Sequence, residues 1–265
     1  MTVPSFREWD SSAYDRISAP QFTWGKKVLD HLSLRGDEVL LDGGCGTGKL
    51  TGELLTLLPR GRLVAVDLSE NMLRKARENV EFRFPARITF VVADLAHLPF
   101  VQAFDGIFST AAFHWIPDHD RLFRSLYRTL RPGGWLVAQC GGGPNLCRLL
   151  ARVDALSQTA TYAAYVGSYQ HRWTFSHPAT TAYSLEAAGF RNVQSSLEPA
   201  PTRFEGEREF SEFVCKVILR EFLEYLPHKS LRRQFLSELA RQAGDDDPPY
   251  QLDYWRLNLE GRRPA

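Results

Sequence analysis

The chain has 265 residues, of which 44% are hydrophobic and 24% are charged, as expected for a soluble globular protein with one large domain. Its 32 Lys and Arg residues balance 31 Asp and Glu residues, so the net charge of +1 predicts no surface for nucleic acid or an anionic membrane. The first residues, MTVPSFREWD, are polar, and no run of about 18 apolar residues occurs, so neither a signal peptide nor a membrane span is expected.

The cysteines and histidines show no pattern of a metal site. Cys45, Cys140, Cys147 and Cys215 form no CxxC pair, and the seven histidines form no HExxH motif. We therefore expect no metal and no disulfide framework. A cytoplasmic protein is the expectation, with a monomer as the default state.

Short apolar runs alternate with helical patterns through the first half of the chain. The first twenty residues show no clear period, and Phe22–Leu34 is predicted to be a helix. The strands predicted next are Val39–Asp42, Arg62–Asp67, Ile88–Ala93, Phe104–Thr110 and Trp135–Gln139, with helices at Leu50–Leu58, Glu70–Asn79 and Asp120–Leu130. Almost wholly apolar strands that alternate with helices predict a parallel sheet covered on both faces.

The second half of the chain is less regular. Its predicted elements are helix and loop over residues 145–172, helices at Thr180–Ala188, Phe210–Leu226 and Leu231–Ala243, and strands at Val193–Leu197 and Asp253–Leu259. The prediction is an α/β, doubly wound, Rossmann-like fold with a mostly parallel seven-stranded sheet and helical cap insertions. We expect one domain over residues 1–265, with an N-terminal cover at about 1–34 and cap segments at about 142–180 and 205–248.

The stretch LLDGGCGTGKLTGEL, Leu40–Leu54, carries the strongest functional signal. Its spacing approaches a phosphate-binding loop, but Leu50 stands where that loop needs a magnesium-binding hydroxyl, and Thr51 lies about 100° further around a helix. It also approaches a dinucleotide fingerprint, but Gly48 comes one residue early, and the Asp42 carboxylate would repel a pyrophosphate.

S-adenosylmethionine fits this stretch better, because it has an α-ammonium group and a ribose diol but no phosphate. Asp42 suits the positive amino-acid end, and the glycines let the backbone approach a ligand closely. Asp67 ends the next strand, where a carboxylate accepts two hydrogen bonds from ribose hydroxyls, and Asp94 is placed for the adenine amino group. Each acid alone reads as a solvated strand end or helix cap, but three at successive strand ends favour cofactor contact.

Four motifs in order resemble those of the class I S-adenosylmethionine-dependent methyltransferases. They are LLDGGCGTG at Leu40–Gly48, AVDLSENM at Ala65–Met72, ADL at Ala93–Leu95 and LRPGGWLVAQ at Leu130–Gln139. Gly43 departs from the family pattern, which has a larger aliphatic residue there. The resemblance implies S-adenosyl-L-methionine as cofactor, S-adenosyl-L-homocysteine as product, and cofactor contacts from Asp42, Gly43, Gly44, Gly46, Thr47, Asp67, Leu68, Met72, Ala93, Asp94, Leu95, Ser109, Thr110 and Trp115.

A narrower similarity points to the trans-aconitate methyltransferase family, whose members methylate carboxylates of small acids. It rests on WDSSAY from Trp9, AFHWIPDH at Ala112–His119, YSLEAAGF at Tyr183–Phe190 and the helices of Phe210–Arg241. The candidate acceptor-side residues are His114 as a base or substrate orienter, Trp9 and Tyr14 as a lid, Trp173, and Arg220 as an anion clamp.

These residues predict an S-adenosylmethionine-dependent methyltransferase of a small molecule. O-Methylation of a carboxylate is favoured, because an ionised carboxylate needs no base and the chain shows one plausible base, His114, without a catalytic dyad. A C- or N-methyltransferase of secondary metabolism on the same fold, a non-catalytic cofactor-binding module and a P-loop nucleotide hydrolase remain alternatives, and the acceptor itself is not identified.

Overall fold

The computed structural model describes residues 8–265, which form two compact units. The first unit comprises the chain up to Gly143, together with Trp173–Leu197 and Leu257–Ala265. The second comprises Pro144–Arg172 and Glu198–Arg256. The segments predicted as caps overlap the second unit, and the assignment of residues 1–265 to one domain stays a prediction.

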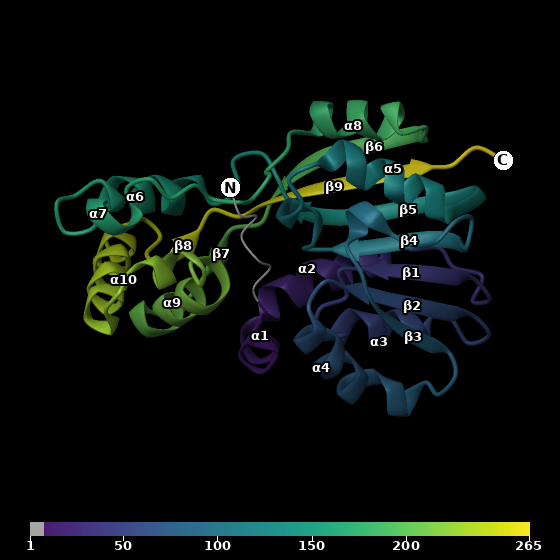
Figure 1. Cartoon of the computed structure of the whole chain (residues 1–265), viewed down its shortest axis with the longest axis horizontal. Coiled ribbons are helices and arrows are strands. Elements are labelled where there is room, and N and C mark those ends of the chain that lie inside the picture. The colour runs from purple at the N-terminus through teal and green to yellow at the C-terminus, as the bar shows by residue number, and fades with distance from the viewer. Residues whose placement is uncertain (1–7) are drawn as a thin grey trace. The chain divides into compact units, whose positions relative to one another are not determined.

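The first unit is built around the central sheet (Figure 1). Among residues 8–265, seven strands lie in the order β3-β2-β1-β4-β5-β9-β6. Their bounds are β1 Val39–Gly43, β2 Arg62–Asp67, β3 Ile88–Val92, β4 Phe104–Thr110, β5 Leu130–Gly141, β6 Arg191–Pro199 and β9 Trp255–Arg262. β1 pairs in parallel with β2 and β4, β2 with β3, and β4 with β5. The predicted doubly wound fold is confirmed, and the strand order reverses beside β1.

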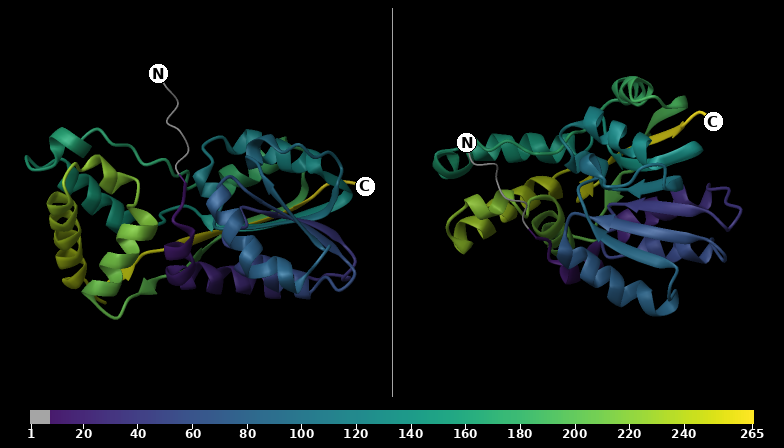
Figure 2. Two further views of the ribbon diagram at one scale, coloured as in Figure 1. Left: turned by 60° about the horizontal axis from the view of Figure 1, so that its bottom comes forward. Right: turned by 45° about the vertical axis from the view of Figure 1, so that its right-hand side comes forward.

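Helices cover both faces of the sheet, as Figure 2 shows. Helices α2 Ala19–Asp30, α3 Lys49–Thr56 and α4 Glu70–Val80 pack on one face, and α5 His119–Thr129 and α8 Pro178–Ala187 pack on the other. Each face of the sheet has its own hydrophobic core, and successive side chains of β1 point to opposite faces. Leu40 lies in the core under α2, α3 and α4, and Leu41 lies in the core under α5 and α8. Both leucines are fully buried, which explains why this strand reads as a continuous apolar run.

The helical content before the sheet was underestimated. Residues Ser11–Ile17 form helix α1, and α2 begins at Ala19 rather than Phe22. Pro20 suggested a break, but it occupies the first turn of α2, where its missing N–H group costs no hydrogen bond. The part of the predicted N-terminal cover before Glu8 lies outside the described residues.

The second unit is largely helical. It contains α6 Cys147–Ser157, α7 Ala163–Val166, α9 Glu207–Phe213, the π-helical turn η4 Val214–Ile218, the 3₁₀ turn η5 Phe222–Tyr225 and α10 Lys229–Gly244. The short strands β7 Thr202–Arg203 and β8 Gln251–Leu252 pair antiparallel. The buried aromatic rings of Phe222 and Phe235 pack together at 5.0 Å in its interior.

The prediction of one helix over Phe210–Leu226 was wrong. The α-helix ends at Phe213, and a π turn follows, closed by a hydrogen bond of 2.8 Å from Leu219 N to Val214 O. The wider turn brings Val217, Ile218 and Leu219 all into buried positions, which one stripe of a regular helix does not allow.

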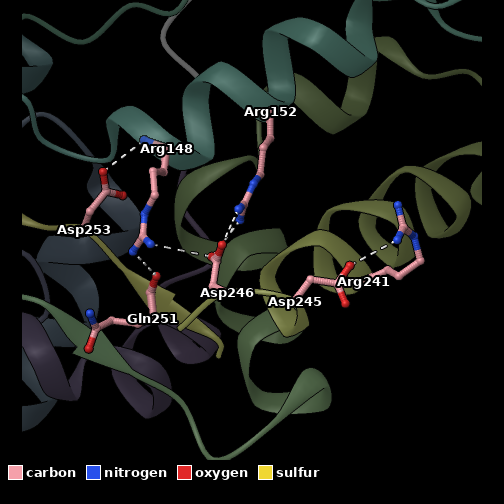
Figure 3. A network of polar contacts seen from close by, with 7 residues as sticks. All are labelled: Arg148, Arg152, Arg241, Asp245, Asp246, Gln251 and Asp253. Atoms are coloured by element: carbon pink, nitrogen blue, oxygen red, sulfur yellow. Dashed lines mark hydrogen bonds and ion pairs between the residues drawn. The ribbon is translucent and has the colours of Figure 1, made fainter. Parts of the chain in front are cut away.

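A group of charged side chains joins α6 to the segment after α10 (Figure 3). Arg152 donates to both carboxylate oxygens of Asp246, at 2.9 and 2.5 Å, and Arg148 donates to the carbonyl oxygen of Gln251 at 3.1 Å. The carboxylate of Asp253 accepts from the backbone N of Arg148 at 2.9 Å and so caps α6. The hydrogen bond from Arg152 outweighs burial and lowers the pKa of Asp246.

We expect Arg152→Ala to destabilise the second unit by about 2–3 kcal/mol, because it leaves a mostly buried carboxylate without its bidentate partner. This contribution is present above the pKa that Asp246 has in the unfolded chain, and it is lost as the pH falls through the lowered folded value. Urea denaturation at neutral and acidic pH measures it.

Arg241→Ala is the matched control, because Arg241 pairs with Glu238 on the surface and its side chain is 63% exposed. Its effect should be much smaller than that of Arg152→Ala, because exposed ion pairs contribute little to stability. Equal losses in the two variants would contradict a structural role for the Arg152–Asp246 pair.

Candidate active site

The glycine loop lies directly after β1 and before α3. The backbone N–H groups of Gly44 and Cys45 both donate to the carbonyl oxygen of Val66, at 2.8 and 3.0 Å, which ties the loop to β2. Gly44 has φ +75°, and a Cβ there would lie 2.3 Å from the Cβ of Ala112. At Gly46, with φ +55°, no atom lies within 4 Å of an added Cβ, so a ligand can approach this backbone closely.

Asp67, the last residue of β2, faces this loop. Its carboxylate accepts from Gly46 N at 2.9 Å and from Ser69 N at 2.9 Å. Burial raises the pKa of Asp67, and these hydrogen bonds oppose the rise. Each oxygen keeps a further lone pair, so both can accept a hydroxyl of a bound ribose. Leu68 follows with 44% of its surface exposed, which provides an apolar contact beside the carboxylate.

Asp42 is a buried carboxylate next to Asp67 on the neighbouring strand. Its side chain accepts a hydrogen bond from Thr51 Oγ1 at 2.6 Å, and the residue is 3% exposed. Burial raises the pKa of Asp42 to about 7; the nearby charge of Asp67 adds to the rise and the Thr51 hydrogen bond opposes it. A cationic group close to this pair would stabilise both carboxylates, so the pair fits the α-ammonium end of S-adenosylmethionine.

Asp94 lies just beyond β3 and caps the 3₁₀ turn η2 Leu95–His97. Its Oδ1 accepts from Ala96 N at 2.9 Å, and its Oδ2 lies 2.8 Å from His97 Nδ1. The side chain is 42% exposed, so it remains accessible to a ligand. The cap holds the carboxylate in a fixed position at the edge of the strand tips.

His114 lies in the 3₁₀ turn η3 Phe113–Trp115, which follows β4. Its carbonyl oxygen accepts from Thr174 N at 2.8 Å, and its ring atom Nδ1 accepts from Gly141 N at 3.3 Å. A backbone N–H group only donates, so Nδ1 carries the lone pair and the proton of the neutral ring is on Nε2. In this state the ring offers an N–H donor at Nε2.

Aromatic side chains from three distant segments meet beside His114. The ring of Trp115 lies 5.4 Å from Trp9 and 5.7 Å from Trp173, both in edge-to-face geometry. The ring of Tyr14 lies 5.5 Å from Trp9. The structure thus brings five of the predicted acceptor-side and cofactor-side residues into one aromatic cluster, defined here as Trp9, Tyr14, His114, Trp115, Trp173 and Phe175.

The remaining predicted site residues take different positions. Ser109 is buried and donates to the carbonyl oxygen of Gly43 at 2.6 Å, and Thr47 donates to Asp15 Oδ1 at 2.7 Å. Met72 and Leu95 are buried, and Ala93 and Thr110 are partly exposed. A Cβ at Gly43 would lie 3.4 Å from the Leu95 side chain, which is an ordinary contact, so this position does not require glycine. Every predicted site residue except Arg220 lies in the first unit.

Arg220 lies in the second unit, in the turn between η4 and η5 rather than on the predicted helix. Its side chain is 17% exposed, and Nη2 lies 3.5 Å from Glu221 Oε1. A guanidinium this deeply buried is unusual for a solvated surface residue.

Several residues around the site were missed from the sequence. They are Glu8, which contacts Ser69; Asp15, which contacts Thr47; Thr51, which contacts Asp42; and Phe175, which contacts His114. Glu8 and Asp15 flank the quoted motif from Trp9 to Tyr14, which is the signal that marks their segment. Their partners lie at least 32 residues away in the chain, so local patterns do not reveal the contacts.

Comparison with known proteins identifies the family. A profile described as "Methyltransferase domain" matches residues 40–134. Trans-aconitate 2-methyltransferase of Acidovorax ebreus (strain TPSY) is 36% identical over 82% of this chain and 86% of its own length. The chain belongs to the trans-aconitate 2-methyltransferase family. The enzyme of that name from Variovorax paradoxus (strain S110) is 30% identical over 94% of both chains.

Family membership makes this chain a class I methyltransferase that uses S-adenosylmethionine, as its motifs predicted. Solved structures share the fold. Phosphoethanolamine N-methyltransferase 2 of Haemonchus contortus, bound to phosphomonomethylethanolamine and S-adenosylhomocysteine, has a TM-score of 0.62 and 21% identity over 96% of this chain and 57% of its own. The [4+2]-cyclase SpnF has a TM-score of 0.59 and 20% identity over 92% of this chain and 82% of its own.

Among residues 8–265 of the methyltransferase, none of the helices is long and apolar enough to cross a membrane. Within the same range, no group of three or more His, Cys, Asp or Glu side chains is arranged to hold a metal ion.

Asp42→Asn tests the buried carboxylate, because it keeps an oxygen for Thr51 but removes the charge. A carboxylate with a raised pKa in the folded chain destabilises the fold above its unfolded pKa, increasingly until the pH passes the folded value of about 7. We expect the cofactor-free variant to be more stable than wild type by on the order of 2–4 kcal/mol at pH 8, and by less at pH 5.

Urea denaturation at both pH values checks the stability, and calorimetry should show weaker binding of S-adenosylhomocysteine, whose ammonium group loses a charged partner. Asn has nearly the same shape as Asp but carries no charge. A stability gain that is equal at pH 5 and pH 8 would therefore show that ionisation of the Asp42 carboxylate is not its cause.

Proposed function

We propose that this methyltransferase transfers a methyl group to a carboxylate oxygen of a small organic acid. The observation that carries the proposal is the hydrogen bond from Gly141 N to His114 Nδ1, which leaves the ring as a donor. Relatives named trans-aconitate 2-methyltransferase, at 30% and 36% identity, support the same class of acceptor.

The chemistry follows from what each side chain offers. Bound S-adenosylmethionine supplies an electrophilic methyl group on a sulfonium. Asp67 and the open backbone at Gly46 hold the ribose side, and the Asp42 carboxylate lies at the amino-acid side. The aromatic cluster excludes water around the sulfonium and holds an acceptor in line with the methyl group.

His114 then orients the acceptor rather than deprotonating it. An ionised carboxylate already carries the electron pair that forms the new O–CH₃ bond, while the C–S bond breaks and sulfur keeps its electron pair. The Nε2–H group of His114 donates to the carboxylate oxygen that does not react. A phenol, amine or carbon acid would need a base, and a ring whose Nδ1 lone pair is occupied and whose Nε2 is protonated does not provide one.

A labelled-methyl assay tests the function directly. Methyl-labelled S-adenosylmethionine is incubated with trans-aconitate, mono- and dicarboxylic acids, phenols and amines, and the products are treated with mild base. A methyl ester releases its label as methanol, whereas an N- or C-methyl group does not. A base-stable product overturns the proposal in favour of the C- or N-methyltransferase alternative, and tight cofactor binding without transfer to any acceptor favours a non-catalytic module.

His114→Gln and His114→Ala separate the orienting role from the base role. Gln keeps an N–H donor at similar reach, so we expect kcat/KM within about tenfold of wild type, whereas Ala should lose about 10- to 100-fold through the missing charge-assisted hydrogen bond. Steady-state kinetics across pH 5–9 measure both. If both variants lose the same factor in kcat/KM, and only wild type shows a kcat/KM that rises with pH, His114 is the base instead.

Arg220 is the proposed anion clamp for a second acidic group of the acceptor. We expect Arg220→Ala to raise the KM for the acid by about tenfold or more, with the Kd for S-adenosylmethionine unchanged. Arg233→Ala, which removes an exposed arginine of α10, is the control and should leave both constants near wild type. Initial-rate kinetics and calorimetry give the two values. An unchanged KM for every accepted acid would contradict this role of Arg220.

A further inference from the structure

A short N-terminal segment crosses the tips of three neighbouring strands. It consists of residues 8–15 and is called the strap here. It contacts the start of α4 after β2, Trp115 after β4, and the loop between β1 and α3. These strands lie side by side in the order β2-β1-β4, and the predicted cofactor contacts lie at the same tips.

Glu8 fastens one end of the strap to α4. Its carboxylate accepts hydrogen bonds from Ser69 Oγ at 2.6 Å, from Glu70 N at 3.0 Å and from Asn71 N at 3.2 Å. Burial acts to raise the pKa of Glu8, but these hydrogen bonds outweigh it and lower the pKa, so the group is ionised at neutral pH. A carboxylate at the positive end of a helix is well placed.

The residues after Glu8 continue across the site. The carbonyl oxygen of Trp9 accepts from Asn71 Nδ2 at 3.2 Å, and the Trp9 ring packs edge-to-face on Trp115. At the other end, the Asp15 carboxylate accepts from Thr47 Oγ1 at 2.7 Å and lies 3.5 Å from Lys49 Nζ. The strap is therefore attached to the start of α4 at one end and to the glycine loop at the other, with Trp9 between the two attachments.

We propose that Glu8 is a positioning residue, which holds Trp9 against Trp115 and thereby retains the cofactor and its product in the site. The strap has to release from α4 before a ligand at the strand tips can leave, and the hydrogen bonds of Glu8 are the contact that has to break. This role does not depend on which acceptor the enzyme methylates.

An ordinary helix cap would give the same contacts at α4 without any effect on ligand release. The two roles differ in their readout. A cap contributes to the stability of the fold, whereas a positioning residue also controls the rate at which the product dissociates, and it does so through Trp9.

Stopped-flow displacement of S-adenosylhomocysteine by excess S-adenosylmethionine, followed by tryptophan fluorescence, measures this rate on the full chain. We expect Glu8→Ala to speed dissociation by about tenfold and to raise the KM for the cofactor, and Glu8→Gln, which keeps an oxygen acceptor, to lie between Ala and wild type. Glu78→Ala, which removes an exposed carboxylate of the same helix that pairs with Lys75, should leave the rate unchanged.

A double-mutant cycle assigns the effect to Trp9. In a Trp9→Ala background, Glu8→Ala should add no further change in the dissociation rate. Asn71→Ala, which removes the other hold on Trp9, should speed dissociation in the same direction and serves if Glu8→Ala folds poorly. The proposal is overturned if Glu8→Ala lowers Tm but leaves the dissociation rate within twofold of wild type, or if its effect persists in full without Trp9.

Discussion

The reversal of strand order beside β1 is the constraint from which the site follows. β1 pairs in parallel with β2 on one side and with β4 on the other, so the chain leaves β1 toward β2 and leaves β4 toward β5 in the opposite direction, and sheets of this kind bind ligands at the carboxyl ends beside such a reversal. Asp42, the last residue but one of β1, and Asp67, the last residue of β2, lie on neighbouring strands, and the charge of Asp67 acts on Asp42. The glycine loop between them is pinned to Val66 by two backbone hydrogen bonds, which leaves the backbone at Gly46 open.

Two carboxylates at such a place select the charge of the ligand. Asp42 and Asp67 are negative when ionised, and burial makes that charge costly and raises the pKa of both. A negative phosphate would therefore add repulsion, while an ammonium group or a sulfonium would stabilise the ionised acids. We therefore propose that the same loop spacing that resembles phosphate-binding and dinucleotide-binding motifs serves a cationic cofactor here. In this proposal the glycines leave space for the ligand, and the two acids favour a positive charge over a negative one.

Sequence patterns predicted the sheet well because its strands are short, apolar and regularly spaced. β2 and β4 were predicted with their observed bounds, and β1 differed by one residue. The patterns were less informative where a residue acts through a distant partner or where backbone geometry changes. The stripe of apolar residues over Phe210–Leu226 indicated a helix correctly at its start but gave no sign of the π turn after Phe213.

The same contrast holds for the site. The acids at the strand tips were found from their position after each strand, whereas Glu8 and Asp15 have meaning only through Ser69 and Thr47. Likewise, the sequence left His114 as either a base or an orienter, and the proposed orienting role depends on Gly141, which lies 27 residues further along the chain. Contacts of this kind join segments that the fold brings together, so neighbouring residues in the sequence do not reveal them.

The position of Gly141 gives the fold a direct influence on the chemistry of the acceptor side. Gly141 ends β5, which pairs with β4, and His114 lies in the turn that follows β4, so the pairing of these two strands determines which ring nitrogen carries the proton. A fold shared with both a phosphoethanolamine N-methyltransferase and a [4+2]-cyclase does not determine the reaction. In this chain we propose that the tautomer of His114, held by the hydrogen bond from Gly141, suits an acceptor that arrives ionised rather than one that must first lose a proton.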